Sequence, residues 1–282
     1  MTVGVLSRQT GYASLGILPI ESTGYEAAMS LDLRAIVRIH DRRPRERPED
    51  PDGILEAVEE VWKSQEYNIP SDKFWWTVDS EIPEAEGLGS SSAIAAAAFS
   101  CLNDWGEEGL DTARLVDLSV AAHALSELDP WGGPAAAWAA LESGWHVCVG
   151  GHSAAEGRVL IGEKESADEF RFFIVSRGPR KIGYDRQSVV TEGDKYAAAF
   201  AEIEQSSPFK ALMLSGRVTS TALNDHTGRQ IANDAIIKGA RFAGLSGHGP
   251  AICVLLSENH DPGMLIGAWE GRGYEVFECV PR

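Results

Sequence analysis

A glycine- and serine-rich loop directly before an alanine-rich helix is the strongest constraint on this chain. Residues 83–99 read PEAEGLGSSSAIAAAAF, and a strand pattern at Phe74–Pro83 leads into them. Gly87 and Gly89 can adopt positive φ angles and let a ligand approach the backbone closely. The helix that follows presents unpaired N–H groups and the positive end of its dipole. The segment predicts a phosphate site, with a simple serine N-cap on the helix as the alternative interpretation.

Other phosphate-binding signatures are absent from the sequence. No GxxxxGK[ST] motif occurs, which excludes a P-loop enzyme. No GxGxxG motif follows a strand pattern, which argues against a dinucleotide-binding Rossmann domain. Asp41-Arg42 follows His40, but the rest of the protein-kinase signature is missing. The glycine–serine loop therefore belongs to none of these three phosphate-binding motifs.

The charge balance restricts the partners that this chain can have. It carries 25 Lys and Arg against 42 Asp and Glu, a net charge of −17. Electrostatic binding of nucleic acid needs cationic surfaces that displace counterions, so no nucleic-acid partner is expected. The oligomeric state is left open, with a homodimer as one option.

The four cysteines and the N-terminal residues indicate the compartment. Cys101, Cys148, Cys253 and Cys279 form no CxxC pair and lie in apolar runs, so buried free thiols are expected. The start, MTVGVLSRQT, lacks the pattern of a signal peptide. No run of about 18 apolar residues occurs, so no membrane partner is expected. These features predict a cytoplasmic protein.

Periodicity predicts an α+β fold in two parts. Strands are expected at Leu33–His40, Phe74–Pro83, Trp145–Val149, Phe170–Ser176 and Tyr274–Cys279. Helices are expected at Gly53–Tyr67, Arg114–Leu125, Pro134–Leu141, Asp194–Gln205, Pro208–Leu223, Gln230–Gly239 and Pro262–Gly271. The alternation in the second half predicts a sheet with helices on one face. A polar stretch at 152–167 marks the boundary between the parts.

Two glycine motifs resemble those of a known family. Pro83-x-x-x-GLGSSSA is similar to the central motif of the GHMP small-molecule kinases, and GLSGHGPA at Gly244–Ala251 is similar to their C-terminal glycine motif. The resemblance implies a two-domain α+β fold. Its N-terminal part would be like ribosomal S5 domain 2 (residues 1–153, with the ATP-binding loop), and its C-terminal part would be ferredoxin-like (residues 154–282).

Within this superfamily the sequence is most similar to the archaeal-type shikimate kinases. The triple serine, the segment STGYEAAMSLDL at 22–33 and the segment AGLSGHGP at 243–250 carry that likeness. It implies ATP-dependent phosphorylation of shikimate to shikimate 3-phosphate, a step of aromatic amino-acid biosynthesis. The alternatives are homoserine kinase, another small-alcohol kinase, or a protein of this fold that binds a nucleotide or metabolite without catalysis.

The resemblance also assigns roles to individual residues. The phosphates of ATP would be held by Gly87, Leu88, Gly89, Ser90, Ser91 and Ser92. The Ser91 hydroxyl would be the metal ligand, on Mg²⁺. The second motif would brace this loop or contact substrate through Gly247, His248 and Gly249.

The chain departs from the family pattern at the acidic position. The corresponding segment is Asp129–Ala136, and no acid stands at the matching place. Asp129, nearest in sequence, is the candidate catalytic acid, with a turn cap before Pro130 as the alternative. Arg180 and Lys181 are candidates for binding a substrate carboxylate, or they belong to a solvated turn. His123 is expected in the core or at its rim.

Overall fold

The computed structural model describes residues 4–45, 50, 53–126, 128, 133–162, 170–180 and 185–282. Within these ranges no helix has both the length and the apolar character needed to cross a membrane. The four cysteines are all buried free thiols, as predicted. Burial raises the pKa of the Cys101 and Cys253 thiols to about 12.

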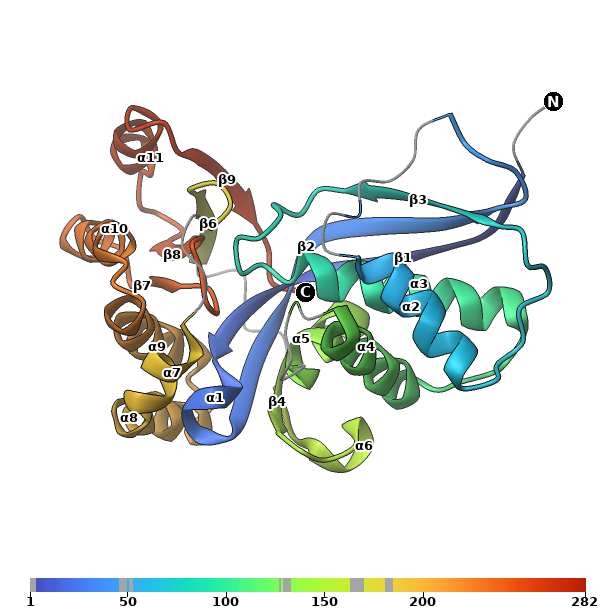
Figure 1. The fold of residues 1–282 in the computed structure, drawn as a ribbon. Helices are drawn as coiled ribbons and strands as arrows, with labels where there is room; N and C mark the ends of the chain where they lie inside the picture. The colour runs from blue at the N-terminus through green and yellow to red at the C-terminus, as the bar shows by residue number, and fades with distance from the viewer. Residues whose placement is uncertain are drawn as a thin grey trace.

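The chain forms two antiparallel sheets with helices between and around them (Figure 1). The strands are β1 (Val5–Leu18), β2 (Tyr25–His40), β3 (Trp75–Ser80), β4 (Trp145–Val149), β5 (Arg158–Gly162), β6 (Phe170–Ser176), β7 (Phe242–Leu245), β8 (Ile252–Ser257) and β9 (Glu275–Cys279). The helices are α1 (Ile20–Thr23), α2 (Ile54–Ser64), α3 (Ser90–Gly106), α4 (Thr112–Ser126), α5 (Pro134–Leu141), α6 (Ala154–Gly157), α7 (Arg186–Thr191), α8 (Gly193–Glu204), α9 (Pro208–Ala222), α10 (His226–Ile237) and α11 (Gly263–Glu270).

The first sheet is organised around β2. This strand pairs with β1 on one side, and on the other it pairs first with β4 through Tyr25–Met29 and then with β3 through Ala35–His40. β5 extends the sheet beyond β4. The residues of β2 that lie between the β4 and β3 pairings contact Arg282, whose N–H donates to Ser30 O at 2.9 Å.

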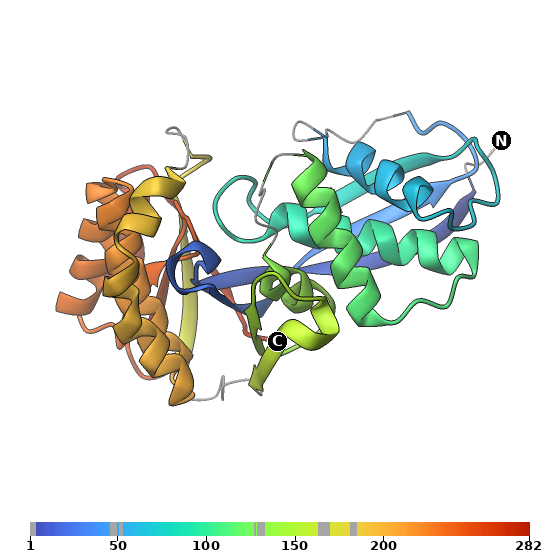
Figure 2. The same cartoon turned by 60° about the horizontal axis from the view of Figure 1, so that its bottom comes forward.

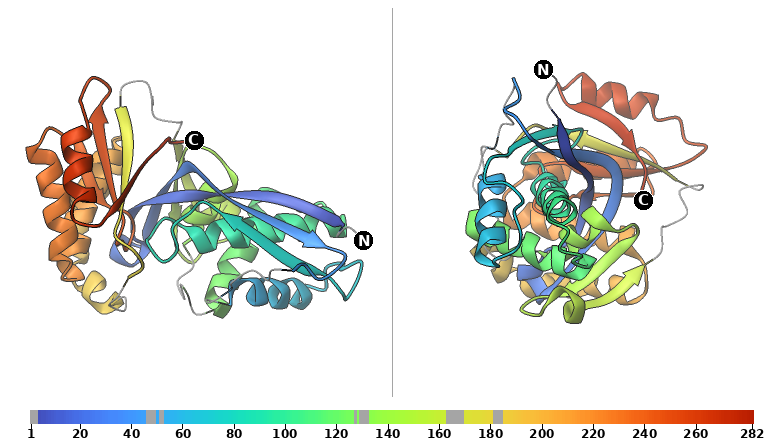
Figure 3. Two further views of the ribbon diagram at one scale, coloured as in Figure 1. Left: turned by 90° about the horizontal axis from the view of Figure 1, so that it is seen from above. Right: turned by 90° about the vertical axis from the view of Figure 1, so that its right-hand side faces the viewer.

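Helices α2 to α5 lie together along this sheet (Figure 3, left). One core cluster joins Val37 and Ile39 of β2 to apolar faces of α2, α3 and α4. In α3 a run of alanines is fully buried, so this helix lies close against β1 and β2. A second cluster holds α5 through Ala135 and Trp138. The sheet thus fixes the N-terminal ends of α3 and α5 near the same strands.

The second sheet has the strand order β7-β8-β6-β9. Alternate residues of β6 lie in different cores: Phe172 and Ile174 pack with α8 and α9, whereas Phe173 and Val175 pack with α10 and α11. Helices therefore cover both faces of this sheet, where the sequence pattern predicted one covered face. The reason is that α8 and α9 fill the space between this sheet and β1.

The β1–β2 hairpin joins the two parts. It runs from the part of the molecule that contains α2 and α3 to the helices of the C-terminal part, and α1 at its tip contacts α7 and α8 (Figures 1 and 2). The largest core cluster contains Leu15 and Met29 of the hairpin together with residues of β6, β8, α8 and α9. The two glycine motifs lie at this junction.

Several elements have the predicted bounds, and others were missed. The helix Pro134–Leu141 and the strands Trp145–Val149 and Phe170–Ser176 are as predicted. β2 begins eight residues before the predicted Leu33. β1, β5 and the short helices α1, α6 and α7 had no prediction. The division at 153/154 stays a prediction, and the first sheet itself continues through β5.

Candidate functional site

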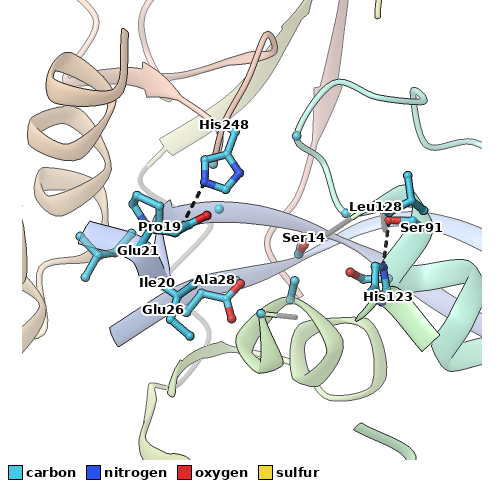
Figure 4. A pocket seen from close by; sticks show the side chains of 18 of the residues that line it. Ser14, Pro19, Ile20, Glu21, Glu26, Ala28, Ser91, His123, Leu128 and His248 are labelled. Atoms are coloured by element: carbon cyan, nitrogen blue, oxygen red, sulfur yellow. Dashed lines mark hydrogen bonds and ion pairs between the residues drawn. The ribbon is translucent and has the colours of Figure 1, made fainter. Parts of the chain in front are cut away.

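A cavity of about 550 Å³ lies where the two glycine motifs meet. Its walls come from β1, β2, the loop before α3, the N-terminal ends of α3 and α5, α4, and the loop after β7. Figure 4 shows Ser91 and His123 on one side of it, and Glu21 and His248 on the other. Its volume lies in the range of small-molecule sites.

The glycine–serine loop forms a backbone cradle at one end of the cavity. Gly87 and Gly89 have φ angles of +79° and +68°, and Gly89 is the N-cap residue of α3. No side chain caps this helix at Gly89. A Cβ at Gly89 would lie 2.2 Å from Ser14 Oγ, so a larger residue does not fit. The N–H groups of the first turn of α3 and the positive end of its dipole are therefore available to an anion.

The second glycine motif packs directly on this cradle. Ser246 Oγ donates a hydrogen bond to Gly87 O (2.7 Å) and accepts one from Gly16 N–H (3.1 Å). Gly247 N–H donates to Gly16 O at 2.8 Å. A Cβ at Gly87 would lie only 2.5 Å from Ser246 O. These contacts hold the second glycine motif against the cradle and against β1.

A buried carboxylate anchors the cradle to the second sheet. Glu86 is 3% exposed. It accepts hydrogen bonds from Ser176 Oγ (2.6 Å) and from Arg177 N–H (3.1 Å) at the end of β6. The Arg177 guanidinium pairs with Asp225. Burial by itself would raise the pKa of the Asp225 carboxyl, but the hydrogen bonds from Arg177 and Gly228 N–H and the nearby positive charge together lower it. The loop is thus held from both parts of the molecule.

The hydroxyl of Ser91 is oriented by a histidine from α4. His123 Nδ1 lies 2.8 Å from Ser119 O, and a carbonyl only accepts, so Nδ1 carries the hydrogen. In the neutral ring Nε2 then accepts from Ser91 Oγ, at 3.1 Å. Because its hydrogen is directed at His123, the Ser91 oxygen can offer its lone pairs to a cation. His123 is 5% exposed, which fits the predicted core position, but it also contacts the site.

These residues fit Mg²⁺ bound together with phosphates. Among the described residues no three His, Cys, Asp or Glu side chains cluster as a metal site. Mg²⁺ in phosphate-transfer sites is commonly held by one or two carboxylates, several waters and the substrate's phosphates, with a Ser or Thr hydroxyl as a further ligand in some enzymes. The oriented Ser91 hydroxyl beside the phosphate cradle supplies a protein oxygen of the required kind.

The opposite end of the cavity carries both signs of charge. Glu21 of α1 lies 3.5 Å from His248 Nε2, and its side chain is only 1% exposed. Arg180 and Arg186 also line the cavity. Arg180 Nη2 donates to the main-chain oxygens of His248 (2.5 Å) and Gly249 (2.8 Å). This end can recognise a polar molecule that carries a carboxylate.

The structure brings together most of the residues singled out from sequence. Gly87, Gly89, the three serines, Arg180, Gly247 and His248 line one cavity. Leu88 does not line it, because its side chain is buried in the core and only its carbonyl is engaged, by Ser14 N–H. Gly249 packs behind the cradle against Leu245. Asp129 and Lys181 lie outside the described residues.

Three charged residues of the cavity were not predicted from the sequence. Glu21, Glu26 and Arg186 all line the cavity. Glu26 is an acid within the apolar run that forms β2, and that position could have signalled function. Arg186 and Glu21 stand on the short helices α7 and α1, whose sequences carry no periodic signal.

Comparison with known proteins finds a family model and a relative that this chain resembles. Residues 53–137 match the family described as "GHMP kinases N terminal domain". Over 203 residues the chain is 28% identical to the shikimate kinase of Methanothermobacter thermautotrophicus, covering 70% of this chain and 68% of that protein. The resemblance inferred from the motifs is confirmed.

Solved structures agree with the two-part architecture. The mevalonate kinase of Methanococcus jannaschii superposes with a TM-score of 0.74 at 14% identity, covering 98% of both chains. The homoserine kinase of Cytophaga hutchinsonii superposes with a TM-score of 0.64 at 13% identity, covering 98% of this chain and 95% of that one. At these identities the likeness shows the fold alone, and it confirms the predicted fold class.

Replacing Gly87 by alanine tests the cradle. We expect a loss of about 2 to 5 kcal/mol in the free energy of unfolding, since the left-handed backbone and a clash both oppose the methyl group. Gly151 is the matched control, with a φ of +78° and no atom within 4 Å of the position that a Cβ would take. Gly151→Ala should cost roughly 1 to 2 kcal/mol, from the backbone alone. Denaturant unfolding measures both, and equal losses would contradict the close packing described for Gly87.

Proposed function

We propose that this chain is a kinase of the GHMP type, which transfers the γ-phosphoryl group of ATP to the hydroxyl of a small molecule. Its phosphate cradle and a polar pocket share one cavity. The observation that carries the proposal is the α3 N-terminus, with its two left-handed glycines and no side-chain cap at Gly89. A kinase of this kind needs positioning and charge neutralisation more than covalent chemistry.

The cavity supplies those two requirements at its cradle end. The N–H groups at the start of α3 and the hydroxyls of Ser90, Ser91 and Ser92 would hold the phosphates of ATP. Mg²⁺, when bound beside Ser91, would neutralise phosphate charge. The Ser246 brace keeps the cradle in one conformation before ATP arrives, so little reorganisation is needed.

Shikimate is the acceptor that we favour. The relative from Methanothermobacter thermautotrophicus is named as a shikimate kinase, and the sequence likeness spans about two thirds of each chain. Shikimate carries a carboxylate, and Arg180 and Arg186, which can pair with one, line the cavity. On this assignment the chain acts in aromatic amino-acid biosynthesis.

One observation favours a second acceptor class. Glu21 and Glu26 line the same cavity as the two arginines, and carboxylates suit the ammonium group of an amino acid. A hydroxyl amino acid such as homoserine presents an ammonium and a carboxylate together. A protein that binds ATP without turnover is the third alternative, and the assay below separates all three.

A coupled assay of ADP release tests the function. Mg-ATP is supplied with shikimate, homoserine, mevalonate or galactose, and we expect release with shikimate. Release with homoserine in its place would move the assignment to the amino-acid kinases. Silence with all four, with ATP binding still visible by calorimetry, would favour another acceptor or a non-catalytic binder.

Removing the Ser91 hydroxyl tests the phosphate end. In Ser91→Ala we expect turnover to fall about a hundredfold or more, because one preorganised polar group at the phosphates is lost. Ser100→Ala is the control on the same helix, since Ser100 Oγ only donates to Ala96 O. Both variants should unfold at the wild-type temperature. Unchanged turnover in Ser91→Ala would refute the role given to this serine.

A further inference from the structure

Phosphoryl transfer to an alcohol releases a proton, and the cavity must hold a group that takes it. Asp129, the acid chosen from sequence, lies outside the described residues. The first turn of α5, at Pro134–Ala137, contains no acidic residue. Among the described residues that line the cavity, only Glu21 and Glu26 are carboxylic acids.

The two acids differ in their surroundings. Glu21 faces His248 at 3.5 Å, and its side chain is 1% exposed. Glu26 enters the cavity from β2. Figure 4 shows its carboxylate between the Glu21–His248 pair and Ser91. An acceptor hydroxyl must lie next to the terminal phosphate, so the acid between the two ends of the cavity is the better placed.

The Glu26 carboxylate is also held in one orientation. Its Oε2 accepts a hydrogen bond from Ala135 N–H at 2.6 Å, in the first turn of α5. A Cβ at Gly133 would lie 2.0 Å from Glu26 Oε1, so glycine at this position leaves room for the carboxylate. An acid from β2 is thus delivered to the start of a helix that has none of its own there.

We propose that Glu26 is the catalytic residue that accepts the proton of the acceptor hydroxyl. This inference rests on the proposed function. As the hydroxyl oxygen bonds to the γ-phosphorus, its hydrogen passes to the Glu26 carboxylate, and the bond from phosphorus to the β,γ-bridging oxygen breaks. ADP leaves with the electron pair of that bond. A carboxylate suffices for this step, because in protein kinases an aspartate carboxylate accepts the proton of the substrate hydroxyl.

Glu26→Gln tests the proposal with little change in shape. The amide oxygen can still accept from Ala135 N–H, so the variant should melt at the wild-type temperature and bind Mg-ATP equally well by calorimetry. We expect kcat to fall about 10²- to 10⁴-fold with both KM values unchanged. Glu56→Gln, an exposed acid on α2, is the control and should match the wild type.

A second variant separates proton transfer from binding. Ala136 lines the same cavity from α5, so Ala136→Asp in the Glu26→Gln background returns a carboxylate to the site. We expect this double variant to recover at least about tenfold in kcat over Glu26→Gln. A raised acceptor KM with unchanged kcat in Glu26→Gln would overturn the proposal and make Glu26 a binding residue. A raised Mg²⁺ requirement would overturn it in favour of a metal ligand.

The wild type measured in parallel distinguishes the role of Glu26 from the kinase function itself. Turnover by the wild type and equal turnover by Glu26→Gln would overturn the role of Glu26 and leave the kinase function standing. No turnover by the wild type with any acceptor would overturn both.

Discussion

The hydroxyl of Ser246 is the contact on which the site depends. It joins three segments far apart in the sequence, by donating to Gly87 O and accepting from Gly16 N–H. Close approach of backbones is needed for both bonds, because a Cβ at Gly16 would lie 2.6 Å from Gly247 Cα. The β1–β2 hairpin, the phosphate cradle and the second sheet are therefore fixed relative to one another before any ligand binds. Such preorganisation is the main source of catalysis when charge must be stabilised.

This constraint also explains which parts of the fold were predictable. Pro134–Leu141 and Phe170–Ser176 were found at their true bounds because composition and local pattern agree with their tertiary environment. β1 gave no signal, since glycines and serines interrupt it. Gly11 lets β1 approach α3 closely, because a Cβ at this position would lie 2.0 Å from Ala93 O of α3. Strand formation here depends on tertiary contacts more than on intrinsic propensity.

The candidate site also has one part that could be predicted from the sequence and one part that could not. The cradle was predictable because glycines, serines and a helix start are contiguous in sequence, and their physics is local. The end of the cavity opposite Ser91 is assembled from α1, β2, α7 and the loop after β7, which contribute Glu21, Glu26, Arg186 and His248. No linear motif encodes that assembly. Glu26 and His123 acquire their roles only through partners 109 and 32 residues away.

The acidity of the chain and its proposed anionic substrate are compatible because the relevant fields are local. The net charge of −17 is spread over the whole sequence, and surface charges are screened within about 10 Å. At the cavity, the N-terminal ends of α3 and α5 and two arginines line the space that a ligand would occupy, and charges interact most strongly at such short range. Two carboxylates remain among them. Because carboxylates repel phosphate, the uncapped start of α3 is the favoured place in this cavity for the phosphates of ATP.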